Sequence, residues 1–195
     1  MTGISACILA AGFSRRMGRP KPLLPIGGDT FLYRIVKTIE RAGIGKIGVV
    51  ISSPIIKEAH GDLDVVWIYN PEPQAGPLRS FQLFLREFNE SEGAFMVPVD
   101  HPLVTRETFS KLMHAFTPDK IFVPVHRGKR GHPPLFGRRF YEDLLEAPLD
   151  EGARYVIHKR KESVVEVEVD DGGILININT PEDLKKIENS SQFLP

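Results

Sequence analysis

The stretch ISACILAAGFSRRMGRPK, residues 4–21, joins an apolar run to a loop that carries small and basic residues. Residues 4–10 are almost all apolar, which is typical of a short buried strand. Small residues at 10–12 let a ligand approach the backbone, and Arg15 and Lys21 add positive charge beside them. Ligands of open parallel sheets bind beyond the carboxyl ends of the strands. The stretch therefore fits either a phosphate-binding loop or a solvated surface loop, and composition alone gives these two interpretations equal weight.

Apolar runs alternate with helical patterns along the rest of the chain. This alternation indicates a mainly parallel sheet covered by helices on both faces. Strands are predicted at residues 46–51, 65–69, 94–99, 121–125, 164–169 and 174–178. Helices are predicted at residues 30–43, 78–88, 105–116, 138–146, 151–158 and from Thr180 onward. Residues 125–134 combine basic and turn residues and are predicted to form a mobile loop.

Composition places the chain among ordinary globular proteins. It has 195 residues, of which 42% are hydrophobic and 26% charged, and we expect a single domain over residues 1–195. Its 25 basic and 25 acidic side chains balance, which argues against a nucleic-acid partner. One cysteine, Cys7, excludes an intramolecular disulfide and favours a reducing compartment. No apolar run approaches the roughly 20 residues that span a membrane, so we expect a cytoplasmic protein without a membrane partner.

The loop after the first strand lacks two common phosphate-binding patterns. A Walker A loop has four residues between its first glycine and the Gly-Lys pair, whereas here five residues separate Gly12 from Gly18 and the lysine comes three residues later. The G-x-G-x-x-G dinucleotide pattern is also absent. These differences argue against kinase, GTPase and dehydrogenase functions.

The run from Leu9 to Lys21 instead resembles the L-A-A/G-G-x-S-x-R-M-G-x-x-K signature of the MobA-like nucleotidyltransferases. Its Ala-Ala-Gly form, with Ala11 where the guanylyl enzymes have glycine, is closest to the molybdenum cofactor cytidylyltransferase branch. Further segments resemble the family in the same order, namely Asn70 with Gly76–Ser80, Val99–Val104, Gly131–Gly137, Asp150–Arg154 and Thr180–Leu184. The resemblance implies a three-layer α/β/α fold of the nucleotide-diphospho-sugar transferase (Rossmann-like) type. It also implies Mg²⁺-dependent transfer of CMP from CTP to a molybdopterin or molybdenum cofactor, with release of pyrophosphate.

The resemblance also assigns roles to particular residues. Catalysis would rest on Lys21 and Arg15, which stabilise charge on the phosphates, and Mg²⁺ would be held by Asp100 and Asn179. The nucleotide would be bound by Leu9, Ala10, Ala11, Gly12, Ser14, Arg15, Lys21, Asn70, Gly76, Ser80 and Asp100. The acceptor would be bound by Arg130, Gly131 and His132, and the product would be handed over to a molybdoenzyme or its chaperone.

Two departures from the family pattern keep alternatives open. Asn177-Ile178-Asn179 stands where the family usually has aspartate, and an amide oxygen brings no charge to a metal. Gly76-Pro77-Leu78 resembles the guanylyl branch. The alternatives are therefore use of GTP, a sugar or polyol phosphate as the acceptor, and a nucleotide-binding protein without turnover.

Three further residues are interpreted from elementary chemistry. His101 is left outside the catalytic set, because a phosphomonoester nucleophile is already anionic at pH 7 and requires no base. Thr180 and Asp183 match the start of a helix and are predicted to be structural. Lys21 lies in a loop with no helix or strand pattern to bury it, so we expect its removal to cost turnover but little stability.

Overall fold

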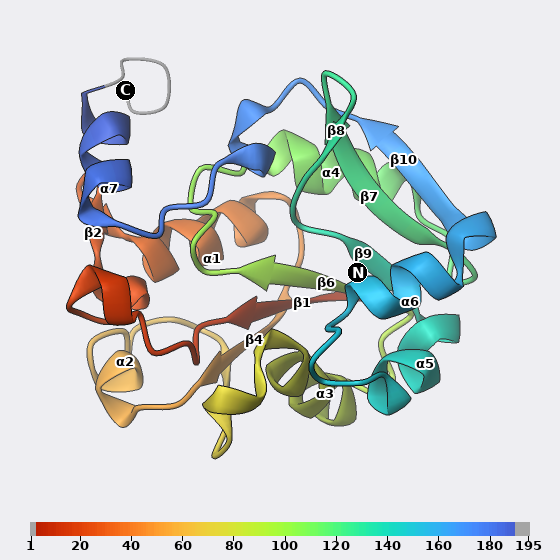
Figure 1. The fold of residues 1–195 in the computed structure, drawn as a ribbon, viewed down its shortest axis with the longest axis horizontal. Helices are drawn as coiled ribbons and strands as arrows, with labels where there is room; N and C mark the ends of the chain where they lie inside the picture. Colours follow the sequence, from red (N-terminus) through yellow and green to blue (C-terminus); the bar gives the residue numbers. More distant parts are fainter. Residues whose placement is uncertain (1–2, 190–195) are drawn as a thin grey trace.

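The computed structural model describes residues 3–189, and a mainly parallel sheet runs through its centre (Figure 1). The order of strands along the sheet is β10-β7-β9-β6-β1-β4-β5. The parallel strands are β1 (Ile4–Leu9), β4 (Lys46–Ile51), β5 (Val66–Tyr69), β6 (Gly93–Pro98), β7 (Ile121–His126) and β10 (Val164–Glu168). Antiparallel β9 (Leu135–Gly137) lies between β6 and β7. A separate two-stranded sheet pairs β2 (Pro25–Ile26) with β3 (Asp29–Thr30).

Helices cover both faces of this sheet, so every residue of β1 is buried. Successive side chains of a strand point to opposite faces. Ala6 and Ile8 accordingly join one core, and Cys7 and Leu9 join the other. The first core includes residues of α1 (Phe31–Arg41), α2 (Pro54–Glu58), α4 (Arg106–Ala115) and α7 (Pro181–Glu188). The second includes residues of α3 (Pro77–Glu87), α5 (Tyr141–Glu146) and α6 (Arg154–Lys159). The predicted three-layer α/β/α fold is confirmed.

Short 3₁₀ helices connect these elements. They are η1 (Arg15–Met17), η2 (Lys21–Leu23), η3 (Pro73–Ala75), η4 (Arg138–Phe140), η5 (Lys161–Ser163) and η6 (Gly172–Leu175). The predicted helices and the strands up to residue 169 lie close to their expected positions. The prediction of one domain over residues 1–195 stays a prediction.

The strand predicted at residues 174–178 is wrong. Its first two residues belong to η6, and irregular chain follows. Ile174 and Ile178 are buried and Ile176 is partly buried, but the backbone bonds to loops instead of a neighbouring strand. The carbonyl of Ile174 accepts a hydrogen bond from the His132 amide at 3.0 Å, and the Ile178 amide donates to the Asp100 carbonyl at 2.8 Å. Alternating apolar residues indicate that one side of a segment is buried. They do not show that its backbone pairs with a neighbouring strand, and here it does not.

The mobile loop predicted at residues 125–134 is also wrong, because its first half is a β-hairpin. β8 (Lys129–Arg130) pairs with the end of β7. Arg127 and Gly128 connect the two strands with φ values of 50° and 73°. Positive φ at both turn residues is the geometry that two-residue hairpins favour. An arginine at a position that favours glycine or asparagine conceals the turn in the sequence.

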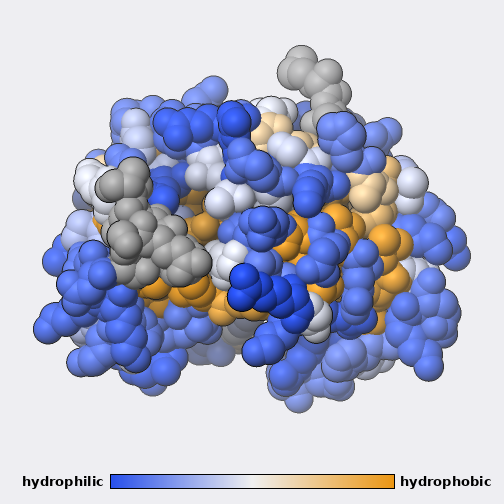
Figure 2. Space-filling model, turned by 90° about the horizontal axis from the view of Figure 1, so that it is seen from above, coloured by the Kyte–Doolittle hydropathy of each residue, from blue (hydrophilic) through white to orange (hydrophobic). Residues whose placement is uncertain are grey.

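One face of the molecule is largely polar (Figure 2). Figure 2 shows hydrophilic residues over most of one face, with hydrophobic residues visible between them. Among the helices formed by residues 3–189, none is both long and apolar enough to cross a membrane.

Candidate functional site

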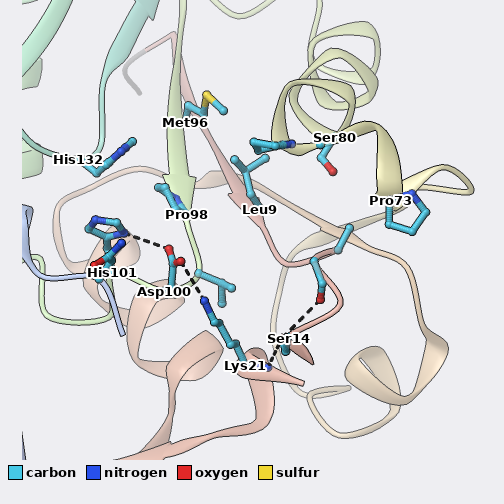
Figure 3. Close-up of a pocket in the computed structure, with 16 residues that line it drawn as sticks. Leu9, Ser14, Lys21, Pro73, Ser80, Met96, Pro98, Asp100, His101 and His132 are labelled. Carbon is cyan, nitrogen blue, oxygen red and sulfur yellow. Dashed lines mark hydrogen bonds and ion pairs between the residues drawn. The ribbon is translucent and has the colours of Figure 1, made fainter. Parts of the chain in front are cut away.

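A cavity of about 410 Å³ opens beyond the carboxyl ends of the neighbouring strands β1 and β6 (Figure 3). Lys21, Asp100 and His101 lie together on one side of it, and Pro73 and Ser80 lie on another. The cavity is lined by Leu9, Ala11, Gly12, Ser14, Lys21, Pro73, Gly76, Pro77, Ser80, Met96, Pro98, Val99, Asp100, His101, His132 and Asn177. The structure thus brings together most of the residues that the sequence assigns to the nucleotide.

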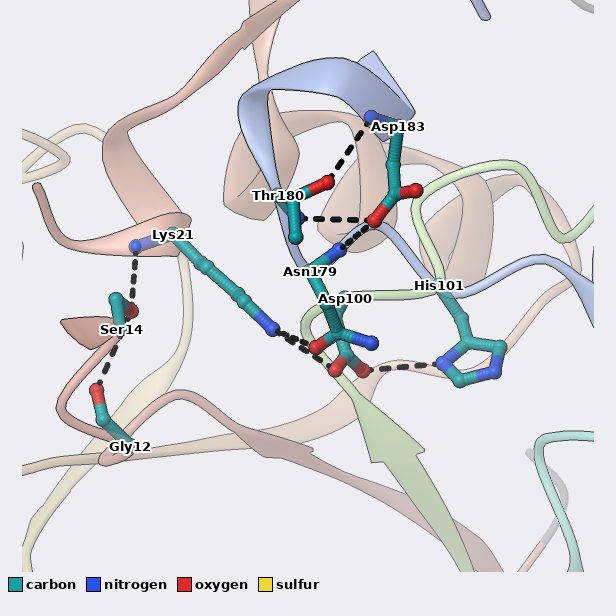
Figure 4. A network of polar contacts seen from close by, with 8 residues as sticks. All are labelled: Gly12, Ser14, Lys21, Asp100, His101, Asn179, Thr180 and Asp183. Atoms are coloured by element: carbon teal, nitrogen blue, oxygen red, sulfur yellow. Dashed lines mark hydrogen bonds and ion pairs between the residues drawn. The ribbon is translucent and has the colours of Figure 1, made fainter. Parts of the chain in front are cut away.

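Ser14 holds the loop between β1 and Lys21 in a closed conformation. Its hydroxyl accepts a hydrogen bond from the backbone amide of Lys21 at 2.9 Å and donates to the Gly12 carbonyl at 3.4 Å (Figure 4). Ser14 itself has a φ of 50°, a left-handed conformation in which short polar side chains are tolerated. The loop therefore turns back on itself and directs the Lys21 side chain toward the end of β6.

The Lys21 ammonium bridges the two side chains that the sequence assigns to a metal. Its Nζ lies 3.0 Å from Asp100 Oδ2 and 2.6 Å from Asn179 Oδ1. The Lys21 side chain is only 13% exposed and that of Asp100 is 23% exposed. This differs from the expectation that Lys21 is an unpacked loop residue, because a contact across 79 positions of sequence leaves no local pattern.

The start of α7 positions Asn179. Asp183 Oδ2 accepts hydrogen bonds from the backbone amides of Asn179 and Thr180, and the Thr180 hydroxyl accepts one from the Asp183 amide. These reciprocal bonds form a capping box, as predicted from the sequence. The structural role of Thr180 and Asp183 thus fixes the residue immediately before the helix.

Asp100 is ionised at neutral pH. Burial alone would raise its pKa, but the hydrogen bond from His101 and the nearby Lys21 charge outweigh burial and lower the pKa to about 2. His101 Nδ1 donates to Asp100 Oδ1 at 3.1 Å, so each carboxylate oxygen has its own partner. His101 is 7% exposed and lines the cavity. Sequence reasoning placed it outside the catalytic set, although its position next to Asp100 at the strand end could have marked it as a partner of that carboxylate.

The oxygens around Lys21 fit a hard divalent cation. A carboxylate and an amide oxygen already converge on one positive charge, and Mg²⁺ prefers such oxygen ligands together with substrate phosphates. Within residues 3–189 no three His, Cys, Asp or Glu side chains gather as a metal-binding group. Asp100 and Asn179 are therefore the side chains to test as metal ligands.

Asn70 does not line the cavity but positions Ser80, which does. It is fully buried, its Nδ2 donates to the Ser80 hydroxyl at 2.9 Å, and its Oδ1 accepts from the Glu72 amide at 2.8 Å. Gly76 begins α3 with a φ of 90°, which glycine adopts without strain. Ser80 and Gly76 line the cavity, whereas Asn70 lies behind them.

A second cavity, of about 510 Å³, adjoins the first and shares Pro77, Met96 and His132 with it. It contains the residues assigned to the acceptor, Arg130, Gly131 and His132. Arg130 is exposed and pairs with Glu166 at 2.6 Å. Gly131 lies against the backbone, since a Cβ there would come within 2.5 Å of the Ile174 carbonyl oxygen.

His132 stands between the two cavities. Its ring centroid lies 4.7 Å from that of His101, and its buried Nδ1 has no hydrogen-bond partner among the described residues. Burial and the neighbouring His101 lower the pKa of His132 to about 4, against a smaller opposing effect of Asp100. The ring is therefore neutral at pH 7.

Besides Asn70, two further residues assigned to the nucleotide lie outside the cavity lining. Ala10 is buried, and its amide donates to the Val50 carbonyl at 2.9 Å, so that amide is occupied within the sheet. Arg15 is exposed, with its guanidinium carbon 5.2 Å from the centroid of the Phe13 ring.

In α/β proteins with a mainly parallel sheet, a cavity beyond the carboxyl ends of the central strands is the usual position of a bound ligand. The sequence matches the model of the MobA-like NTP transferase domain over residues 6–164, and the chain belongs to this family of nucleotidyltransferases. The family prediction made from Leu9–Lys21 is confirmed.

Solved structures share the fold over almost the whole chain. Rv0371c from Mycobacterium tuberculosis H37Rv is 25% identical with a TM-score of 0.83, covering 97% of this chain and 99% of that one. A 4-diphosphocytidyl-2C-methyl-D-erythritol synthase from Anaerococcus prevotii is 21% identical with a TM-score of 0.75, covering 95% and 94%. Molybdopterin-guanine dinucleotide biosynthesis protein A from Archaeoglobus fulgidus is 18% identical with a TM-score of 0.65, covering 93% and 95%. The names of the last two proteins give different products, a diphosphocytidyl methylerythritol and a molybdopterin-guanine dinucleotide, so the shared fold leaves the substrate open.

A further structure of the mycobacterial protein Rv0371c is a complex with manganese. It is 23% identical to this chain with a TM-score of 0.76, and the match covers 96% of this chain and 99% of that one.

Proposed function

We propose that this protein transfers CMP from CTP to a phosphorylated acceptor, most closely a molybdopterin or molybdenum cofactor, and releases pyrophosphate. One observation carries the two-substrate reaction. Two cavities of about 410 and 510 Å³ adjoin at His132, and the smaller one holds the loop, lysine and carboxylate assigned to the nucleotide. A group-transfer enzyme requires two such neighbouring spaces, whereas simple nucleotide binding requires one.

The chain's residues have defined tasks in this reaction. An oxygen of the acceptor phosphate attacks the α-phosphorus of the nucleotide, the bond to the β-phosphate breaks, and pyrophosphate leaves. The acceptor phosphate is already anionic, since its second pKa is about 6, so no side chain has to remove a proton. The enzyme acts by positioning the substrates and stabilising charge on the phosphates.

Lys21 exchanges partners when the nucleotide binds. Without substrate, its ammonium neutralises Asp100 and bonds to Asn179. With substrate, we infer that Lys21 moves to the phosphates and that Asp100 and Asn179 hold a divalent cation. That cation supplies positive charge to the triphosphate when bound. His101 keeps its bond to the other oxygen of Asp100 and so keeps the carboxylate oriented.

Support for a divalent metal comes from this chemistry and from the related mycobacterial protein. Asp100 has a pKa of about 2 and is a ready anionic ligand, while Asn179 adds an uncharged oxygen. The manganese complex of Rv0371c agrees with a divalent metal in this family. We propose Mg²⁺ as the metal, with Mn²⁺ as a convenient probe.

The preference for cytosine rests on Ala11. This residue lines the first cavity, where its methyl group takes space that glycine would leave open. A purine needs more room than a pyrimidine, so the methyl group disfavours GTP. The Gly76-Pro77-Leu78 segment, which resembles the guanylyl branch, argues in the other direction.

Pyrophosphate release tests the reaction. The purified protein is incubated with Mg²⁺, each of the four nucleoside triphosphates in turn, and either a molybdopterin or a sugar or polyol phosphate. We expect release with CTP and the molybdopterin. Release with only a sugar or polyol phosphate would move the acceptor to the alternative class, and preference for GTP would remove the cytidylyl assignment. Absence of release under every condition would leave a nucleotide-binding protein.

A further inference from the structure

A third cavity, of about 450 Å³, lies at the edge of the sheet opposite Asp100. Gly137 at the end of antiparallel β9 pairs with Gly93 at the start of β6, so the residues after Gly137 lie at the amino-terminal edge. Asp100, in contrast, follows the carboxyl end of β6. The third cavity has no lining residue in common with the two cavities of the proposed catalytic site.

Three arginines line this third cavity against one carboxylate. Arg86 comes from the last turn of α3, Arg138 and Arg139 come from η4, and the carboxylate is that of Glu142. Within residues 3–189, none of the three guanidinium groups lies within 4.0 Å of a carboxylate oxygen. Because the whole chain has a formal charge of zero, this positive excess is local.

Tyr141 adds an unused hydrogen-bond donor. It lines the same cavity and is 7% exposed, and its buried hydroxyl has no partner among the described residues. Burial raises the pKa of Tyr141 above its ordinary value, and Arg138 only partly offsets this, so the hydroxyl keeps its proton. Buried polar groups are nearly always paired, and an unpaired one calls for an explanation.

The walls of the cavity are held in place by hydrogen bonds to backbone carbonyls. Gln82 Nε2 donates to the carbonyls of Leu144 and Leu145 at 3.0 and 3.2 Å, which fixes α5 against α3. Arg138 Nη1 donates to the Glu90 carbonyl at 3.3 Å, which orients one guanidinium. The cavity that the three exposed arginines line is thus present without a ligand.

We propose that this cavity binds the phosphate group of a small phosphorylated molecule. Planar guanidinium groups suit phosphate because they donate parallel charge-assisted hydrogen bonds. Arg86, Arg138 and Arg139 supply those donors, Tyr141 supplies a neutral one, and the apolar wall at Leu85 accommodates part of the ligand's carbon body. The same helix α3 lines the nucleotide cavity with Ser80 and this cavity with Arg86, so a ligand here contacts an element of the catalytic site.

Calorimetric titration with inorganic phosphate, at constant ionic strength, tests the site. We compare the wild type with the double variant Arg86→Gln/Arg139→Gln, whose two side chains make no ion pair in the described structure. Losing two charged donors should weaken phosphate binding at least about tenfold. The matched control Arg41→Gln/Lys57→Gln removes the same charge from exposed positions elsewhere and should bind as the wild type does.

A second comparison separates this site from the catalytic one. Lys21→Met removes the cation of the nucleotide cavity and should leave phosphate binding at the third cavity intact. The proposal is overturned if Lys21→Met abolishes the phosphate binding, or if Arg86→Gln/Arg139→Gln binds phosphate as the wild type does.

Tyr141→Phe tests the hydroxyl without disturbing the packing. Because that hydroxyl has no partner in the unliganded protein, its removal should not lower the melting temperature, yet it should weaken phosphate binding by about threefold or more. Unchanged phosphate affinity in this variant would remove Tyr141 from the site.

Discussion

Replacing Lys21 with methionine should strengthen the binding of a divalent cation in the absence of nucleotide. In the wild type the Lys21 ammonium lies 3.0 Å from Asp100 Oδ2 and 2.6 Å from Asn179 Oδ1, so it holds both oxygens that we assign to the metal. A cation that enters must first displace this ammonium. Methionine has a similar length and no charge, so the variant frees the oxygens and leaves Asp100 without a counterion.

The size of the effect follows from the exposure of the pair. Coulomb's law gives about 1.4 kcal/mol for unit charges 3.0 Å apart in water and about 5.5 kcal/mol at an effective dielectric constant of about 20. Desolvation offsets part of this attraction. Exposed pairs contribute about 0.2–1 kcal/mol, and breaking a buried pair costs about 3–5 kcal/mol. With 13% and 23% exposure, Lys21 and Asp100 lie between these cases. We therefore take about 2 kcal/mol, which is about 30-fold in affinity.

Electron paramagnetic resonance of free Mn²⁺ measures this directly. Titrations without nucleotide should give a dissociation constant about 30-fold lower for Lys21→Met than for the wild type. Lys21→Arg keeps the charge and should show no such gain. Asp100→Asn in either background should remove most of the binding. Equal or weaker Mn²⁺ binding by Lys21→Met would refute the idea that the Lys21 ammonium and the metal occupy the same position between Asp100 and Asn179.

Four further predictions concern single residues. Asp100→Asn should reduce turnover by about 100-fold and raise the Mg²⁺ concentration that the residual activity requires, so an unchanged Mg²⁺ dependence in steady-state kinetics would place the metal elsewhere. Ala11→Gly should shift the ratio of kcat/KM for CTP and GTP toward GTP by about 10–200-fold, and an unchanged ratio would separate Ala11 from base selection. In the folded protein the pKa of His132 is about 4, below its ordinary value of 6.5. Between pH 4 and pH 6.5 the unfolded chain therefore binds a proton at His132 that the folded protein does not. Stability should therefore fall as the pH drops from about 6.5 toward 4, and urea unfolding of His132→Leu should show a shallower fall. Cys7 is fully buried with a raised pKa, so a thiol reagent should modify it only at the rate of unfolding, and rapid labelling of the native protein would contradict its burial.

The sequence predicted those parts of the fold in which local pattern and burial coincide. β1 and α1 carry strong strand and helix periodicities, and both lie where expected. β9 has only three residues and runs antiparallel between β6 and β7, and so short a segment has no periodicity to detect. The strand predicted at residues 174–178 is wrong for the opposite reason. These residues do alternate between apolar and polar, but their backbone bonds to loops.

The candidate site was predictable where a motif names the residue and less so where distant segments meet. Lys21 and Asp100 were identified individually, but their ion pair joins residues far apart in sequence. The bond between His101 and Asp100 and the pairing of His101 with His132 likewise depend on how β6 and the segment before β9 lie together. Arg15 shows the converse, because a match to the motif did not place its side chain in the cavity.

The attachment of the segment before α7 to the site has a consequence for synthesis of the chain on the ribosome. Asn179 contacts Lys21, and the Ile178 amide bonds to the Asp100 carbonyl. The proposed metal site therefore combines residues that are far apart in the sequence. The central strands can pair while translation is still under way, since β1, β4 and β6 all lie in the first half. The proposed metal site cannot form until residue 179 has emerged from the exit tunnel. A nascent chain would thus contain the loop before Lys21 well before Asn179 is available to Lys21 and Asp100.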